Sequence, residues 1–111
     1  DTDDNILNEF DRQVVRGEKV EFLDLFIAYM DVKMHRMFKK DAEIRVSDAV
    51  LTIFKKREQL EIFNKKAIYI FIREITGEET PIITKVVKKM KGEYQKCYSK
   101  YLETGYIYNH E

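Results

Sequence analysis

Breakers of regular structure, cysteine and long apolar segments are all scarce in this chain of 111 residues. It contains one proline, four glycines and a single cysteine, Cys97, which excludes an internal disulfide and fits a reducing cytoplasm. No apolar segment approaches the roughly 20 residues of a membrane-spanning helix. The first residues, DTDDNILNEF, are acidic, unlike the positively charged start of a secretory signal. We therefore expect a cytoplasmic protein with no membrane contact.

The composition favours one helical domain. Hydrophobic residues make up 44% of the chain and charged residues 36%, which is typical of a globular protein. A chain of this length can bury a single core, and no linker rich in glycine, proline or serine divides it. We predict an all-α fold, a compact bundle of about five helices in one domain, 1–111. Within it we expect an N-terminal helical pair (1–40), a three-helix unit (47–104) and a tail (105–111).

Apolar residues at intervals of three and four predict two helices in the first part of the chain. The first covers about 4–16, where one face carries Ile6, Leu7, Phe10 and Val14. The second covers about 20–39, and its broad apolar stripe makes it the expected central packing helix. That stripe consists of Phe22, Leu25, Phe26, Tyr29, Met30, Met37 and Phe38.

The segment DAEIRVSDA (41–49) is predicted to break the helical pattern. EIRV (43–46) is a candidate short strand that could pair with GYIYN (105–109) in a minimal two-stranded element. Ser47 and Asp48 are good N-cap residues for a third helix, about 48–60.

Two further helices are predicted, at about 64–76 and 81–103. The run IYIFI (68–72) is rich in β-branched and aromatic residues, so a buried strand is the alternative there. The last helix carries Ile83, Val86, Val87, Met90, Tyr94, Cys97 and Tyr101 at helical spacing and ends at Gly105. Its tyrosines, with those at 106 and 108, are expected to pack against a neighbouring helix or a dimer partner.

A tight turn is predicted between these last two helices. Gly77 follows the first of them, as a helix C-terminus prefers. Thr80 is a good N-cap for the next, and Pro81 suits a first helical position because its missing N–H costs nothing there. A glycine that ends one helix, followed closely by residues that start the next, is typical of a helix-turn-helix.

Residues 67–90 resemble the helix-turn-helix of bacterial and phage DNA-binding regulators. Ile75 and Gly77 match the end of the supporting helix, and Ile83, Val86 and Val87 match the buried face of the recognition helix. The resemblance covers about 24 residues. Two positions depart from the pattern: Arg73 replaces the usual small residue four before the glycine, and Glu78 replaces the usual apolar residue after it.

The resemblance implies that helix 80–104 enters the major groove of double-stranded DNA by its N-terminal part. Its first turns would then expose Thr80, Thr84, Lys85, Lys88 and Lys89, of which Thr84 and Lys85 are chemically suited to base edges. Phosphate contacts would come from further basic residues on this helix and its neighbours. These are Lys88, Lys89, Lys91, Lys55, Lys56, Arg57, Lys65 and Lys66.

Charge distribution supports such a role more than net charge does. The chain is neutral overall, but residues 54–100 hold 12 Lys and Arg against 6 Asp and Glu, whereas residues 1–50 hold 8 against 12. A competing interpretation is a helical protein-interaction module, such as a polymerase accessory factor or an inhibitor, without DNA contact. There the acidic N-terminal half, with Asp1, Asp3, Asp4, Glu9 and Asp11, would bind the partner.

Residues suited to catalysis or metal binding are few and scattered. Neither His35 nor His110 has a second metal-ligating side chain at a suitable spacing. Cys97 lies on the apolar side of its helix, as a core residue would. There is no phosphate-binding glycine loop. We expect no enzymatic activity, no metal and no cofactor, and a function in transcription regulation.

Overall fold

The computed structural model describes residues 20–59 and 65–107, and all regular structure in these two ranges is helical. Four α-helices follow one another, α2 (Val20–Met37), α3 (Asp41–Lys55), α4 (Lys65–Thr76) and α5 (Thr80–Thr104), and a short 3-10 helix, η1 (Arg57–Gln59), comes after α3. The predicted all-α class is confirmed for this part of the chain. The predicted helix at 4–16 and residues 108–111 lie outside the described residues.

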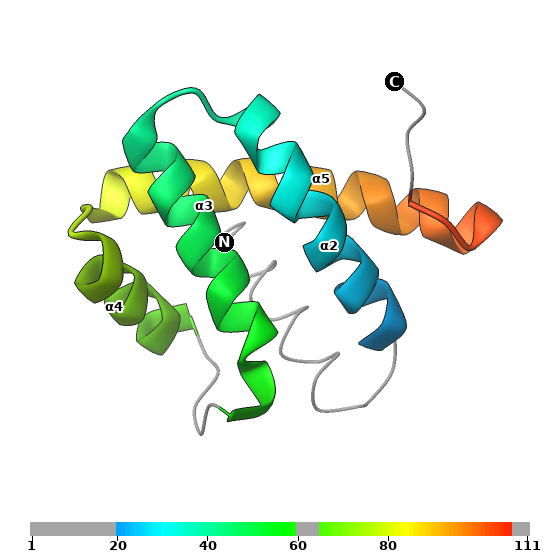
Figure 1. Ribbon diagram of the computed structural model, residues 1–111, viewed down its shortest axis with the longest axis horizontal. Helices are drawn as coiled ribbons and strands as arrows, with labels where there is room; N and C mark the ends of the chain where they lie inside the picture. Colours follow the sequence, from blue (N-terminus) through cyan, green and yellow to red (C-terminus); the bar gives the residue numbers. More distant parts are fainter. Residues whose placement is uncertain (1–19, 60–64, 108–111) are drawn as a thin grey trace.

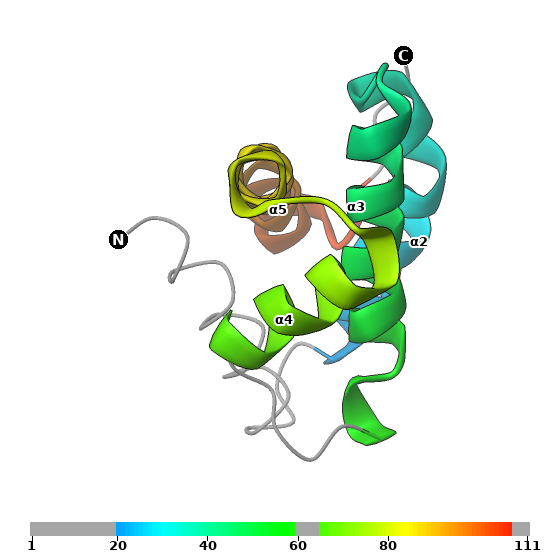
Figure 2. The same cartoon turned by 90° about the vertical axis from the view of Figure 1, so that its left-hand side faces the viewer.

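Helix α3 is the centre of the described part. It packs against α2, α4 and α5, whereas α2 and α4 lie on opposite sides of it. Figures 1 and 2 show α2 and α3 side by side, with the long α5 crossing both from one side. The prediction that helix 20–39 would be central is therefore wrong. Helix α2 has its predicted bounds to within two residues, but α3 is the helix that makes the most extensive contacts with the other three.

The predicted break at 41–49 is also wrong. Helix α3 begins at Asp41, and its first turn carries Asp41 and Glu43, whose negative charges suit the positive end of the helix dipole. EIRV is helical, so it forms no strand with the residues after Gly105. Ser47 is fully buried in the second turn and donates a hydrogen bond of 2.9 Å to the Ile44 carbonyl. A serine satisfied in this way need not cap a helix.

Helix α4 confirms the preference for helix over strand at IYIFI. Ile68, Tyr69 and Ile72 are buried together on one side, the spacing of a helix face. The helix ends as predicted at Gly77, which has φ +74° and donates its N–H to the Arg73 carbonyl at 2.8 Å. This is the left-handed C-terminal cap for which glycine carries no Cβ penalty.

Helix α5 begins at its predicted N-cap, one residue before its predicted first residue. Thr80 is its first residue, and the cap is the extended Glu79, whose carbonyl accepts the N–H groups of Ile82 and Ile83. Thr80 is therefore not the N-cap, because Glu79 already holds the non-helical position. The end at Gly105 is confirmed: it has φ +80° and donates to the Tyr101 carbonyl at 2.8 Å.

Aromatic rings join α2 to the C-terminal half of α5. Phe22 packs edge-on against Tyr94 at 5.3 Å between ring centroids and also contacts Tyr98 and Tyr101 at 5.1 Å each. Phe26 meets Tyr94 edge-to-face at 5.2 Å. Such tilted contacts are favoured by the ring quadrupoles. Three of the predicted tyrosines thus pack against a neighbouring helix, while Tyr106 is 65% exposed.

Candidate nucleic-acid interface

Helix α5 divides into an apolar inner side and a lysine-rich outer side. Its buried residues recur at intervals of three and four and face α2 and α3. Six lysines lie around the rest of the helix, and we call them the lysine face: Lys85, Lys88, Lys89, Lys91, Lys96 and Lys100. All are exposed except the half-buried Lys91. They span 15 positions of a helix, or about 22 Å at 1.5 Å per residue.

The acidic residues of α5 leave this face almost uniformly positive. Glu93 is 8% exposed and turns inward, where it accepts a hydrogen bond of 2.5 Å from the Tyr29 hydroxyl and lies 3.8 Å from the Lys33 ammonium. Glu103 is exposed but lies in the last turn. Between Lys85 and Lys100, therefore, the helix presents lysines without an outward carboxylate of its own.

The residues predicted to be exposed on the first turns of this helix differ in their placement. Thr80 is exposed and accepts a hydrogen bond of 3.3 Å from the Arg73 guanidinium. Thr84 is half-buried. Lys85 is exposed, and its ammonium lies 2.8 Å from the Glu43 carboxylate of α3. Lys88, one turn further, is exposed and has no ion pair within the described ranges. Lys88 is thus more available to an external partner than Lys85.

Near Glu43 lies a lysine, Lys40, that the sequence analysis did not assign to the site. Its hydrogen bond from Lys85 holds the pKa of its carboxyl below the ordinary range, and the charges of Lys40 and Lys89 act in the same direction. Lys40 therefore lies close to the first turns of α5. It is exposed, in the connection between α2 and α3. No pattern in the sequence could place this connection beside α5.

Lys89 also joins this connection to α5. Its ammonium lies 5.8 Å from the centre of the Phe38 ring, which is within the range of a cation–π interaction. Phe38 is buried and immediately precedes the exposed Lys39 and Lys40. The first half of the lysine face thus continues onto the α2–α3 connection.

Four of the predicted flanking residues do not join the lysine face: Lys55, Lys56, Arg57 and Lys66. Lys55 pairs with Asp31 at 3.0 Å, and Lys56 is exposed at the end of α3, away from the crossing with α5 (Figures 1 and 2). Arg57 is buried, donates to the Phe54 carbonyl at 2.7 Å and pairs with Asp24 at 2.9 Å. Its guanidinium is buried and paired within the fold, and its assignment as a phosphate contact stays a prediction. Lys66 is exposed on α4, and the side chain of Lys65 lies outside the described part.

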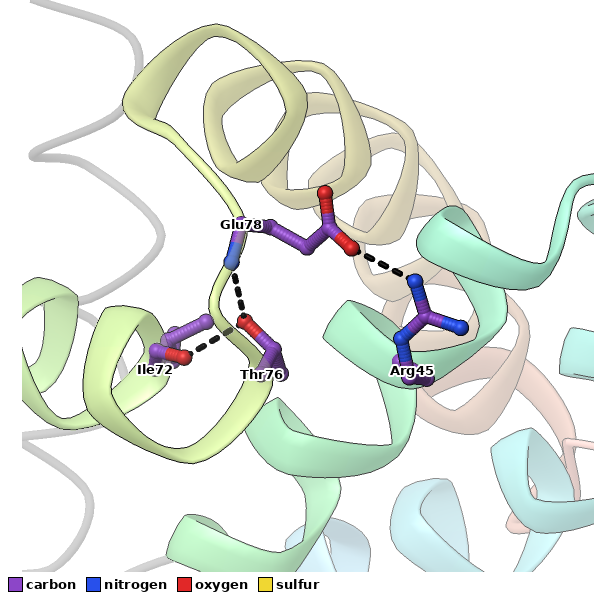
Figure 3. A network of polar contacts seen from close by, with 4 residues as sticks. All are labelled: Arg45, Ile72, Thr76 and Glu78. Atoms are coloured by element: carbon purple, nitrogen blue, oxygen red, sulfur yellow. Dashed lines mark hydrogen bonds and ion pairs between the residues drawn. The ribbon is translucent and has the colours of Figure 1, made fainter.

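The turn between α4 and α5 is tied to α3 through Glu78 (Figure 3). The Glu78 carboxylate accepts a hydrogen bond of 2.6 Å from the Arg45 guanidinium. The Glu78 N–H donates to the Thr76 hydroxyl at 3.1 Å, and that hydroxyl donates to the Ile72 carbonyl at 2.6 Å. Glu78, one of the two departures from the family pattern, thus holds a structural ion pair. Its negative charge is largely offset by Arg45.

An exposed glycine lies in the middle of the lysine face. Gly92 is four residues after Lys88 and four before Lys96, so the three share one stripe of the helix. A Cβ added at Gly92 would meet nothing within 4 Å. Internal packing therefore does not explain a glycine there, although glycine costs about 1 kcal/mol relative to alanine inside a helix. The stripe leaves the backbone of α5 open to close approach from outside.

The buried thiol of Cys97 lies beside the polar pair of Tyr29 and Glu93. Burial, together with the charge of Glu93, raises the pKa of the thiol to about 11. Burial and the hydrogen bond to Glu93 raise the pKa of the Tyr29 hydroxyl as well. At neutral pH the thiol is protonated and covered, so it is not an activated nucleophile.

Three further observations concern metal sites, membrane spans and similar proteins. In the described ranges, no three His, Cys, Asp or Glu side chains gather where they could hold a metal ion. None of the helices described there is both long and apolar enough to cross a membrane. Comparisons with protein-family models, with curated proteins and with solved structures find no match for this chain.

Proposed function

We propose that this protein binds double-stranded DNA through the lysine face of α5, and that this binding serves transcription regulation. The observation that carries the proposal is the separation of charge on α5: its lysines face outward, while the Glu93 carboxylate turns inward to Tyr29. A positive strip of about 22 Å can run beside the phosphates of a duplex, where each phosphate it neutralises releases a condensed counterion.

The geometry of α5 favours a groove over a flat anionic surface. An α-helix fits the major groove, which is about 12 Å wide. Along the stripe from Lys88 to Lys96, Gly92 lets the helix backbone come closer to a phosphate or base edge than any larger residue would. We assign Lys88 and Lys96 to the phosphates on either side of that approach.

The turn at Gly77 supports the same arrangement. Its ion pair from Glu78 to Arg45 fixes the start of α5 on α3 and offsets the carboxylate that would otherwise repel DNA. The pair between Lys85 and Glu43 has a second consequence. Because the Lys85 ammonium already pairs with the Glu43 carboxylate, we expect Lys85 to contribute less to DNA binding than Lys88 does.

The test is a salt titration of binding to a labelled duplex by fluorescence anisotropy. If four to six phosphates are neutralised, the logarithm of the binding constant should fall with the logarithm of salt at a slope of about −4 to −5. The double variant K88Q/K96Q should reduce the magnitude of that slope by about two. The matched control is K55Q/K56Q at the far end of α3, which should leave the slope unchanged.

Three outcomes would count against the proposal. The first is a wild-type protein without duplex affinity at about 50 mM salt, where electrostatic binding is strong. The second is equal loss of affinity in the lysine-face variant and in the control, because binding would then not be located on α5. A labelled single strand of the same sequence is the reference ligand, and tighter binding to it than to the duplex would contradict docking in a groove.

A further inference from the structure

Helix α4 exposes more large hydrophobic side chains than its neighbours do. Ile70 is 41% exposed, Phe71 43% and Ile75 58%. They are three of the six large hydrophobic side chains that are exposed in the part of the chain that the structure describes. The opposite side of α4 already buries Ile68, Tyr69 and Ile72 in the core. The helix is therefore apolar on two sides, and only one of them is used within the fold.

The position of α4 leaves its second side accessible. In Figures 1 and 2, α4 forms one edge of the described molecule, and α2 lies on the far side of α3. Among the described elements, α4 packs against α3 and α5. Its outward residues therefore lie at an edge where another molecule can reach them.

Two opposite charges on this outward side lie at equal distances from Ile70 along the helix. Lys66 lies four residues before Ile70, and Glu74 lies four residues after it, so the three form one stripe. Both charged side chains are exposed, and neither forms an ion pair with another residue of the described ranges. This stripe has a cation at one end, a hydrophobic residue at its centre and an anion at the other end. Two copies of it that run antiparallel are therefore complementary, because each cation then lies opposite an anion.

We propose that α4 is a homodimer contact in which a second copy of this chain packs antiparallel across Ile70. A two-fold axis at Ile70 sets the Lys66 of one copy opposite the Glu74 of the other, and this happens twice. The two Ile70 side chains meet at the axis, with Phe71 covering one flank. The alternative parallel pairing sets Lys66 against Lys66 and is repulsive, so the charges select the antiparallel arrangement.

A second copy fits this surface better than a partner of a single charge. An acidic partner would be attracted by Lys66 and repelled by Glu74. A basic partner would be attracted by Glu74 and repelled by Lys66. The contact involves one helix of 12 residues, which is smaller than a standard interface of about 1,600 Å² in total. We therefore expect a weak dimer whose population depends on the protein concentration.

The test is sedimentation equilibrium of the full chain without DNA, so that it does not depend on the proposed function. The wild type should shift from monomer to dimer as its concentration rises to about 0.5 mM. I70D should remain monomeric, with V32D as the matched control because Val32 is exposed on α2. Far-UV circular dichroism shows that each variant is folded. A wild type that stays monomeric throughout, or an I70D variant that dimerises as the wild type does, would overturn the inference.

Charge-reversal variants distinguish this antiparallel contact from nonspecific apolar association. K66E and E74K should each weaken self-association at least tenfold, because each sets like charges opposite each other twice. The double variant K66E/E74K should regain the wild-type dissociation constant. An equimolar mixture of the two single variants should form a mixed dimer that neither forms alone. Absence of the mixed dimer, or no rescue in the double variant, would contradict the antiparallel arrangement.

Discussion

The Tyr29 hydroxyl donates a hydrogen bond of 2.5 Å to the Glu93 carboxylate and so joins the middle of α2 to the middle of α5. Glu93 is 8% exposed, and its other nearby charge is the Lys33 ammonium at 3.8 Å. A buried carboxylate needs such partners because its loss of hydration is costly. The pair thus keeps a negative charge off the outer face of α5 and fixes the rotation of that helix.

Replacing Tyr29 by phenylalanine tests how much this hydrogen bond stabilises the fold. The change leaves a buried carboxylate with one partner fewer, and we expect it to lower the free energy of unfolding by about 1–3 kcal/mol. Urea denaturation measures this loss. The matched control is Tyr106→Phe, which removes the hydroxyl of an exposed tyrosine and should change stability by less than about 0.5 kcal/mol. Equal effects of the two substitutions would show that the buried pair is not stabilising.

Acid should weaken the link between α3 and α5. Lys85 holds the pKa of Glu43 below its ordinary value, so the folded state binds a proton at Glu43 less readily than the unfolded state does. The contribution of this pair is therefore fully present above about pH 4.3, the ordinary pKa of a glutamate. It is lost as the pH falls through the lower, folded-state pKa.

The comparison of wild type with Glu43→Gln isolates this contribution. At pH 7 the variant should be less stable in urea denaturation, because it removes a largely buried carboxylate that pairs with Lys85. Toward pH 3 the difference between the two proteins should shrink, as the wild-type carboxyl also becomes neutral. A difference in stability that stays constant from pH 7 to pH 3 would contradict a lowered pKa at Glu43.

The turn at Gly77 shows what could be predicted from the sequence. Glycines followed by a change in hydrophobic pattern predicted the ends of α4 and α5, and both have positive φ. Both signals are local, since they depend on backbone conformation within one turn. The start of α3 was predicted wrongly because it depends on packing with residues far away in the sequence and not on local preference. Ser47 was interpreted as a cap because its local preference is for helix starts, yet it lies 3.3 Å from the Met34 sulfur in the core.

The candidate site was less predictable than the helices. The helix-turn-helix resemblance implied that Thr84, Lys85, Lys88 and Lys89 would be exposed; the three lysines are, whereas Thr84 is half-buried. Whether a lysine is paired, however, depends on residues far away in the sequence. Glu43 and Arg45 on α3 meet Lys85 and Glu78 only because α3 packs against the start of α5. The same packing explains why Arg57, basic like its neighbours, is buried beside Asp24.

Alanine at Gly77 should destabilise the protein through the backbone alone. Gly77 has φ +74°, and a Cβ there would meet no atom within 4 Å, so no clash accompanies the substitution. A non-glycine residue in the left-handed region costs about 1–2 kcal/mol, and we expect Gly77→Ala to lose that amount in urea denaturation. Gly77→Asn should lose less, because asparagine tolerates this conformation. Equal stability of Gly77→Ala and wild type would mean that the turn adopts a different backbone.

Substitution of Gly92 should separate stability from DNA binding. Gly92 is exposed inside α5 and has open space where a Cβ would lie, so Gly92→Ala gains helix propensity without a clash. We expect a gain of about 1 kcal/mol in the free energy of unfolding. Under the proposed function the same methyl group lies where DNA approaches most closely, so affinity for the duplex should fall. Gly92→Gln, with a larger side chain, should weaken binding further while it also stabilises the helix.

The matched control for Gly92 is Ser99→Ala, seven residues further along the same outer side of α5. It changes one small exposed residue to alanine without filling the gap between Lys88 and Lys96, so binding should be unaffected. Thermal unfolding and duplex anisotropy on the same samples give both quantities. If Gly92→Ala and Gly92→Gln raise the melting temperature and bind as wild type does, DNA does not approach α5 at Gly92. Reduced binding in these more stable variants could not be attributed to unfolding, and it would locate the contact on this stripe.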